Sequence, residues 1–409
     1  MTDVQANVRN AMSKPEFIAL IAMMFATIAF SIDAMLPALP EIGAELSPDD
    51  LNKAQLILTS FVLGMGIGTF FTGPLSDAFG RKPVIFGGAV IYIAACAVAW
   101  QSRSLELVLA ARVVQGIAVA APRIVGLAIV RDLFAGREMA KIMSFAMMVF
   151  TIFPAFAPLI GSGIIGVIGW RGIFLAFILF SLISVLWLAM RLPETLPTED
   201  RRAFRLPLLM DALRQLFANT TVRISIGVQT LCLAILFTML SMVQPVYDVI
   251  FDEGDSFAKW FFLVALISGT ASILNAALVG RVGMRRMISW SLGLQTLVSL
   301  AVLCVGFVMD ASPVYFAVFI AYQTGVFFMA GTTMGNINAI AMEPMGHIAG
   351  MAASVMGAIS TVGAAIIGAT IGQFFNATII PLAGGITVMA FLAFLLMLYM
   401  DRIEKRGVI

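Results

Sequence analysis

The chain alternates between long apolar runs and short polar segments. A helix needs about 20 residues to cross a bilayer at a rise of 1.5 Å per residue. By this measure the pattern predicts twelve transmembrane helices, near residues 17–38, 54–74, 83–101, 105–130, 139–165, 171–191, 222–246, 258–279, 287–308, 312–339, 348–374 and 378–400. We therefore expect an all-α integral membrane protein.

Composition agrees with a membrane location, since 61% of the residues are hydrophobic and only 12% are charged. Soluble domains carry about 25% charged residues. The net charge of +2 gives no reason to expect a nucleic-acid partner. The sequence has no phosphate-cradling G-x-x-x-x-G-K-[ST] motif and no metal-ligand spacing of cysteines. We expect no enzyme activity, no cofactor and no metal, and a transport step driven by an ion gradient.

The basic residues indicate the orientation of the chain. With the N-terminus in the cytoplasm, 19 of the 25 lysines and arginines fall on the cytoplasmic side and four on the outside. Cytoplasmic loops of membrane proteins are enriched in Lys and Arg. The pattern predicts that both termini are cytoplasmic.

The longest polar interruption, residues 192–221, divides the predicted helices into six and six. The expected organisation is an N-terminal half over residues 1–191, a cytoplasmic linker over 192–221 and a C-terminal half over 222–409. A plain linker is the simpler interpretation, although 208–217 also has the apolar spacing of an amphipathic helix. Two six-helix repeats around a central site would produce this division.

Three charged residues lie deep within apolar runs, namely Asp33, Arg112 and Arg123. A charge at mid-bilayer depth costs about 2.5–3.5 kcal/mol on insertion scales, so it usually faces a partner or a watery cavity. Counted from the cytoplasmic ends of their helices, Asp33 and Arg112 lie about 24 and 28 Å deep. We expect the two at similar depth.

The predicted fourth helix carries a polar face. Arg112, Gln115, Gly116, Val119 and Arg123 follow the spacing i, i+3, i+4, i+7 and i+11. Eleven residues at about 100° each return to within roughly 20° of the start. This face is expected to form a wall of a cavity.

Each candidate has two interpretations. Asp33 and Arg112 form a permanent structural ion pair, or Asp33 exchanges a proton while Arg112 tunes its charge. Arg123 extends toward cytoplasmic water, or it binds an anionic substrate. The polar residues of the second half either line the cavity or join helices; those assigned to the expected substrate site, with Asp33, Arg112, Gln115 and Arg123, are Gln229, Asn336 and Asn338.

The loop after the second predicted helix reads GPLSDAFGRK over residues 73–82. It resembles the signature loop of the major facilitator superfamily, G-x-L-x-D-x-x-G-R-K. The resemblance implies the major facilitator fold, with twelve helices in two pseudo-symmetric halves. It also implies that Gly73, Asp77, Gly80 and Arg81 latch the halves in one conformation. In the matching loop of the second half Gly280 stands where the acid would be, so a latch there is expected to be weaker or different.

Further segments resemble the drug:proton antiporters of the Bcr/CflA type, among them residues 31–40, 111–116, 154–162 and 341–350. Pro158 and Gly161 match the antiporter motif G-x-x-x-G-P-x-x-G-G, whereas Ala157 and Ser162 replace two of its glycines. The resemblance associates the positions of Asp33 and Arg112 with proton and substrate coupling. Arg123 departs from it, since a small apolar residue is expected there.

The expected function is proton-coupled export of small organic compounds by alternating access, with Asp33 as the proton carrier. The expected partners are protons, a small-molecule substrate and the lipid bilayer, and the expected state is a monomer in a bacterial inner membrane. The alternatives are a proton-coupled importer of an organic anion and a non-transporting receptor or lipid flippase on the same fold.

Overall fold

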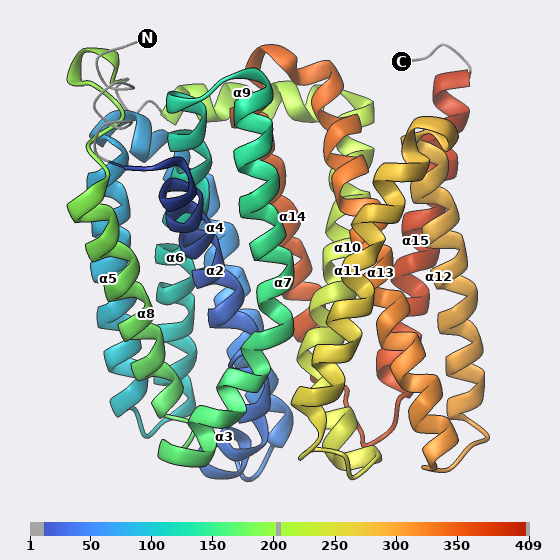
Figure 1. Cartoon of the computed structure of the whole chain (residues 1–409). Helices are drawn as coiled ribbons and strands as arrows, with labels where there is room; N and C mark the ends of the chain where they lie inside the picture. Colours follow the sequence, from blue (N-terminus) through green and yellow to red (C-terminus); the bar gives the residue numbers. More distant parts are fainter. Residues whose placement is uncertain (1–11, 202–205, 406–409) are drawn as a thin grey trace. The chain divides into compact units, whose positions relative to one another are not determined.

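The computed structural model describes residues 12–201 and 206–405 (Figure 1). Within these ranges twelve helices are long and apolar enough to cross a membrane. The prediction of an all-α integral membrane protein with twelve spans is confirmed. Four of the basic residues used to predict the orientation lie outside the described residues, as does part of the predicted linker: Arg9, Arg202, Arg205 and Arg406.

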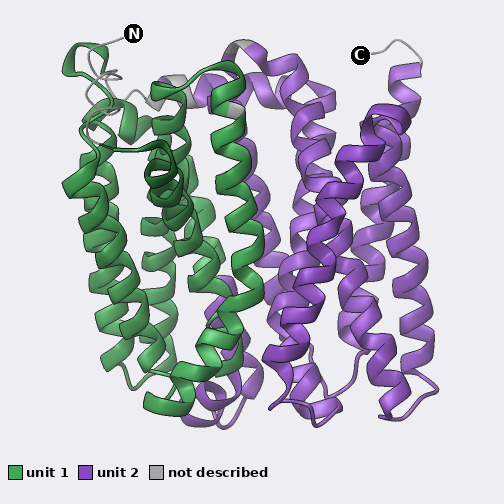
Figure 2. Cartoon of the chain, viewed as in Figure 1, with its two compact units in different colours: residues 1–38, 60–206 green, residues 39–59, 207–409 purple. Residues whose placement is uncertain are grey.

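The chain forms two compact units (Figure 2). Unit 1 comprises Met1–Ala38 and Ser60–Leu206, and unit 2 comprises Leu39–Thr59 and Pro207–Ile409. A short segment that follows the first transmembrane helix therefore packs with the second half of the chain.

The helices of the first half follow one another with short connections. They are α2 Lys14–Asp33, η1 Leu36–Ala38, α3 Leu39–Leu46, η2 Leu51–Gln55, α4 Leu56–Phe79, α5 Arg81–Gln101, α6 Leu105–Leu133, α7 Gly136–Ile168, α8 Gly172–Arg191 and η3 Thr198–Asp200.

The sequence left residues 208–217 open between a plain linker and an amphipathic helix, and in the structure they form a helix, α9. The elements of the second half are α9 Leu206–Ala218, α10 Thr220–Pro245, η4 Val246–Ile250, α11 Phe257–Val282, α12 Met284–Gly306, α13 Pro313–Met342, η5 Glu343–Ile348, α14 Ala349–Gly372 and α15 Ile380–Lys405. In α9, Ala212 and Leu216 are buried while Met210 and Phe217 are exposed.

The same packing order occurs in both units. In unit 1, α2 packs against α6, α7 and α8, and α5 packs against α6 and α8. In unit 2, α10 packs against α13, α14 and α15, and α12 packs against α13 and α15. In each half the first transmembrane helix packs against the fourth, fifth and sixth, and the third packs against the fourth and sixth. The two halves are therefore pseudo-symmetric six-helix repeats, as predicted.

The first helix ends earlier than its apolar run. Ser13 caps α2, since its side chain accepts from the Glu16 amide at 3.4 Å. The helix ends at Asp33, and Pro37 lies in the short 3-10 turn that follows. Proline has no amide hydrogen and cannot continue an α-helix. This interruption of the helix places Asp33 at a helix terminus, inside an apolar run that continues to Leu46.

The segment between α3 and α4 is fastened to the end of α14 by reciprocal hydrogen bonds. Asn52 Nδ2 donates to the carbonyl of Phe375 at 2.7 Å and to that of Gln373 at 3.3 Å. Gln373 Nε2 donates to the carbonyl of Asn52 at 3.0 Å. Both side-chain amides thus satisfy backbone oxygens that belong to the other segment.

Two helices of unit 1 meet at backbone distance. A Cβ atom built on Gly116 of α6 would lie 2.1 Å from the carbonyl oxygen of Phe61 on α4. A Cβ on Gly64 would lie 2.0 Å from the carbonyl of Val113, and one on Gly68 would lie 2.3 Å from that of Ile117. Small residues allow such close approach between membrane helices. This seam fixes the position of α6, which carries Arg112.

Replacing Gly116 with alanine is expected to lower the thermal stability of the purified protein, because the new methyl group must push α4 away from α6. Overpacking of this kind costs about 1–3 kcal/mol. The measurement is the melting temperature in detergent. Gly163→Ala on α7 is the matched control, since nothing lies within 4 Å of its Cβ position. Equal melting temperatures of the two variants would contradict the close packing.

Candidate functional site

Arg112 is fully buried inside unit 1, with an exposed fraction of 0%. Its Nη1 donates to Gln115 Oε1 at 2.8 Å, and its Nη2 donates to the backbone carbonyl of Ser31 at 2.9 Å. The guanidinium also lies over the ring of Phe61, 4.2 Å from the ring centre. An arginine over an aromatic face gains a favourable cation–π interaction. Arg112 therefore joins α6 to α2 and α4.

Asp33 lies two residues beyond the carbonyl that Arg112 binds, which places the two residues at similar depth. The Asp33 side chain is 5% exposed. Within the described part of the chain its carboxyl group makes neither an ion pair nor a hydrogen bond. The structure thus holds Arg112 on the α2 backbone and does not show the permanent Asp33–Arg112 ion pair that the sequence left open.

Only one of the two polar side-chain atoms of Gln115 has a hydrogen-bond partner among the described residues. Its Oε1 accepts from Arg112, whereas its buried Nε2 has no hydrogen-bond partner among the described residues. A buried donor without a partner costs about 1–3 kcal/mol. The amide nitrogen is therefore available to a group that enters the site.

Arg123 lies eleven residues after Arg112 on α6 and has a different environment. Arg112 is buried, whereas Arg123 is exposed. Its guanidinium lies 5.9 Å from the centre of the Phe150 ring on α7. Within the described residues Arg123 makes no ion pair and no hydrogen bond. The two arginines share a helical face, but only the first is used to hold helices together.

The two residues that match the antiporter motif lie on α7, and both prolines of this segment, Pro154 and Pro158, are inside the helix. A Cβ on Gly161 would lie 2.2 Å from the carbonyl oxygen of Ala34. Gly161 therefore allows α7 to contact the chain directly after Asp33.

The 73–82 segment is not the loop that the sequence predicted, because α4 continues to Phe79 and only Gly80 separates it from α5. The segment forms a charged network inside unit 1. Arg81 is 3% exposed; its Nη1 donates to Asp77 at 2.5 Å and to Ser76 Oγ at 2.8 Å, and its Nε donates to Asp132 at 2.9 Å. Gly80 has a φ of +101°, a conformation that favours glycine. The arginine thus connects the end of α4 with the end of α6.

Glu194, which no sequence pattern singled out, caps the start of α5. Its Oε1 accepts from the Arg81 amide and its Oε2 from the Lys82 amide, both at 3.0 Å. Carboxylates are stabilised at the positive end of a helix. Thr195 Oγ1 donates to Asp132 at 3.3 Å, which ties the chain after α8 to the same network.

The second half has a reduced version of this network. Gly283 between α11 and α12 has a φ of +88°, matching Gly80. Arg285 Nε lies 2.7 Å from a carboxylate oxygen of Glu404 at the end of α15, and Arg285 Nη2 lies 3.9 Å from Glu343 after α13. The acid missing at Gly280 is thus compensated in part by acids from two later helices.

The polar candidates of unit 2 bind one another. Gln229 Nε2 on α10 donates to Asn338 Oδ1 on α13 at 3.2 Å. Asn336 Nδ2 donates to Asn275 Oδ1 on α11 at 2.7 Å. Of the two predicted interpretations, the joining of helices is the one that these contacts display.

A further polar contact of unit 1 was not predicted. Tyr92 on α5 and Ser31 on α2 share a hydrogen bond of 2.5 Å between their hydroxyl oxygens. Tyr92 is one of only five tyrosines and lies within an apolar run. Its isolation was the available signal, but the partner 61 residues away could not be read from it.

The comparisons agree with this architecture. Residues 19–369 match the Major Facilitator Superfamily model. The chain is 31% identical to a bicyclomycin resistance protein homolog of Haemophilus influenzae over 69% of this chain and 71% of that protein. It is 28% identical to the multidrug resistance protein MdtL of Shewanella oneidensis over 67% and 68% of the respective chains.

Among solved structures, the xylose transporter XylE of E. coli in a partially occluded inward-open conformation superposes with a TM-score of 0.73. The identity is 14%, and the match covers 96% of this chain and 98% of that one. At this identity the likeness shows the fold. Together with the 73–82 segment and the twelve helices, the matches show that the chain belongs to the Major Facilitator Superfamily and, within it, to the Bcr/CflA type.

Proposed function

We propose that the protein exports small organic compounds from the cytoplasm, coupled to proton entry, by alternating access of its two halves. The observation that carries the proposal is the buried carboxyl group of Asp33, which has no ionic partner among the described residues although Arg112 binds the carbonyl of Ser31, two residues earlier. The resistance functions named for the bacterial relatives support export of drug-like compounds. The same relatives support a bacterial inner membrane. The distribution of basic residues supports cytoplasmic termini.

Asp33 supplies the coupling in this scheme. A carboxyl group in apolar surroundings favours its neutral, protonated form, whereas water or a nearby cation favours the ionised form. In the conformation described here Arg112 is occupied by Ser31 and Gln115, so the site suits a protonated Asp33. A rearrangement that lets water or Arg112 reach the carboxyl group releases the proton. With one such acid, the expected exchange is one proton per cycle.

Asp33→Asn is expected to abolish transport driven by a pH gradient, because asparagine keeps the shape of the side chain but cannot exchange a proton. The measurement is uphill substrate movement in proteoliposomes with an imposed gradient. Asp49→Asn, an exposed acid outside the site, is the control. Normal uphill transport with unchanged pH dependence in the Asp33 variant would refute the assignment.

Arg123 sets the expected substrate preference. Its exposed guanidinium has a ring on one side and no acid among the described residues, so its N–H groups can bind a carboxylate. This observation also favours the second candidate function, proton-coupled import of an organic anion. The direction of proton movement on substrate addition distinguishes the two.

Arg123→Ala is expected to weaken binding of a carboxylate compound about 10- to 100-fold, the range for a lost charge-assisted hydrogen bond, while an uncharged amide of the same compound binds as before. Binding is measured by titration of purified protein. Arg131→Ala, an exposed arginine at the cytoplasmic end of α6, serves as control. Equal loss for both compounds, or no loss, would remove the anion preference.

The 73–82 segment is proposed to control the change between conformations. Every contact of Arg81 described above lies within unit 1, so the arginine holds the ends of α4 and α6 and the chain after α8 as one piece. Asp77, half exposed, is the member of the network that can exchange partners when the halves move. Gly80 supplies the turn between α4 and α5, whereas Gly73 lies within α4.

Arg81→Ala is expected to destabilise the protein by about 3–5 kcal/mol, because two carboxylates lose their buried partner. Asp77→Asn should cost less stability yet shift the balance of conformations, measured by spin-label distances between the halves. Arg103→Ala, an exposed arginine, is the control for charge alone. An unchanged distance distribution in the Asp77 variant would argue against the latch.

A further inference from the structure

Helix α9 ends directly before α10, the first transmembrane helix of the second half, and Figure 1 shows it running across the direction of α10. Only Asn219 separates the two helices. Its Oδ1 accepts from the Val222 amide at 3.1 Å, and its backbone amide donates to the carbonyl of Gln215 at 3.3 Å. These bonds hold α9 at the end of α10, where the apolar run of α10 meets the membrane surface.

The side chains of α9 form three sectors around the helix axis, at about 100° per residue. Ala212 and Leu216 are buried and lie against the protein. Met210 and Phe217 lie in the next sector, beside the half-buried Leu213, and each is 47% exposed. A helix with large apolar side chains on one side and polar ones on the other favours the plane of the membrane interface.

The remaining sector is polar, and Arg214 lies at its border. This residue is exposed and lies about 40° from Met210 around the axis. Arginine can cover apolar surface with its stem while its charged end stays in water. Arg214 makes neither an ion pair nor a hydrogen bond with any described residue, so its guanidinium is available to a lipid head group. The acid of α9, Asp211, lies further round in the polar sector and accepts from Gln215 Nε2 at 2.8 Å.

The charge of this part of the chain is positive. After the acids Glu199 and Asp200, residues 201–223 contain five arginines and one acid. Two of these arginines, Arg202 and Arg205, lie outside the described residues, whereas Arg223 in the first turn of α10 is described and exposed. Basic segments next to a transmembrane helix are attracted to the anionic lipids of the cytoplasmic leaflet. The charge of this segment is therefore complementary to an anionic lipid surface.

We propose that α9 docks on the cytoplasmic leaflet, with Met210 and Phe217 among the acyl chains and Arg214 on the phosphate of an anionic phospholipid. The docked helix also fixes the start of α10, because Asn219 joins the two. This docking requires a membrane around α10 and does not require proton coupling. The cytoplasmic leaflet is the one that the proposed orientation of the chain assigns to this end of α10.

The test uses the full-length protein in vesicles of phosphatidylcholine that carry a trace of phosphatidylglycerol with a photoreactive acyl chain. After illumination, the lipid adducts on residues 206–218 are quantified by mass spectrometry of the digested protein. A high yield on this segment is expected from phosphatidylglycerol, and a low yield from phosphatidylcholine with the same photoreactive chain. Equal yields from the two lipids would overturn the proposal.

Arg214→Gln is expected to lower the phosphatidylglycerol yield about fivefold, the effect of one basic residue near an anionic surface. Arg103→Gln, which removes an exposed arginine from the connection between α5 and α6, is the matched control and should keep the wild-type yield. Met210→Ser/Phe217→Ser should lower the yields from both lipids, because the contact with the acyl chains is lost. An unchanged yield in Arg214→Gln, or an equal fall in Arg103→Gln, would contradict the docking.

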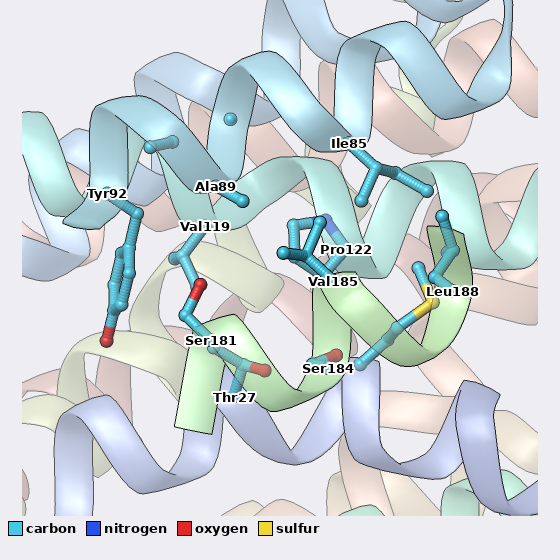
Figure 3. A pocket seen from close by; sticks show the side chains of 13 residues that line it. Thr27, Ile85, Ala89, Tyr92, Val119, Pro122, Ser181, Ser184, Val185 and Leu188 are labelled. Carbon is cyan, nitrogen blue, oxygen red and sulfur yellow. The ribbon is translucent and has the colours of Figure 1, made fainter. Parts of the chain in front are cut away.

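Val185→Ala is the control for a general loss of stability. Val185 lines a small cavity among α2, α5, α6 and α8 (Figure 3), so this variant removes apolar volume from unit 1 and leaves α9 unchanged. Its yields should match those of the wild type, and a fall as large as that of the α9 variants would overturn the docking. Asp33→Asn should also keep the wild-type yield, so a failure of the proton-carrier assignment is distinguishable from a failure of this proposal.

Two other occupants of the α9 face are separated by the same measurement. Displacement of the phosphatidylglycerol adduct by soluble glycerol phosphate would assign Arg214 to a dissolved anion. A yield that falls as the protein is packed more densely in the vesicles would show that a second copy of the chain covers α9. Either result would overturn the docking on lipid.

Discussion

The placement of one buried positive charge constrains most of the first unit. Arg112 carries its guanidinium into an apolar interior and shares it among a backbone carbonyl, an amide and an aromatic ring. Burying a charge is tolerable only when such partners are supplied. Three helices must therefore keep their positions at the depth of Arg112. The close seam at Gly116 and the Tyr92–Ser31 hydrogen bond both serve this requirement.

The same placement explains why Asp33 is set apart from its neighbour. If Arg112 faced the carboxylate directly, the pair would favour the ionised acid and a fixed structure. In this structure the arginine instead binds the carbonyl of Ser31, two residues before Asp33. A buried acid without an ionic partner among the described residues can respond to small shifts of α2 or α6. Arg123 has no comparable constraint, since it is exposed and makes neither an ion pair nor a hydrogen bond with any described residue.

The fold could be predicted from the sequence because a transmembrane helix is recognised by the length and apolarity of one continuous stretch of the chain. Length, apolarity and the 73–82 segment predicted twelve helices in two halves, and the counting of residues placed Asp33 and Arg112 at one depth. Their partners could not be predicted in the same way. Every residue carries a carbonyl group, so nothing in the sequence marked that of Ser31 as the acceptor for Arg112.

The rest of the site depended on contacts between distant segments. Arg112 and Arg123 share a helical face, but only the neighbouring helices decide that the first is buried and the second exposed. The sequence left Gln229 and Asn338 open between lining the cavity and joining helices; they are 109 positions apart and bind each other. Tertiary neighbours, rather than local pattern, determine whether a polar side chain in a membrane helix is available.

The reciprocal bonds between Asn52 and Gln373 bear on how such chains recombine. The residues belong to opposite halves of the gene, yet they pack in one unit of the structure. A chimera joined at the linker would unite Gln373 with a foreign residue at position 52. Unless that residue is also an asparagine, the carbonyls of Gln373 and Phe375 would lose the side-chain donor that Asn52 supplies. A chimera of two relatives that keeps these contacts must therefore take residues 39–59 from the same parent as the second half. Suitable crossover points are set by the hydrogen bonds between segments and not by the order of the helices along the chain.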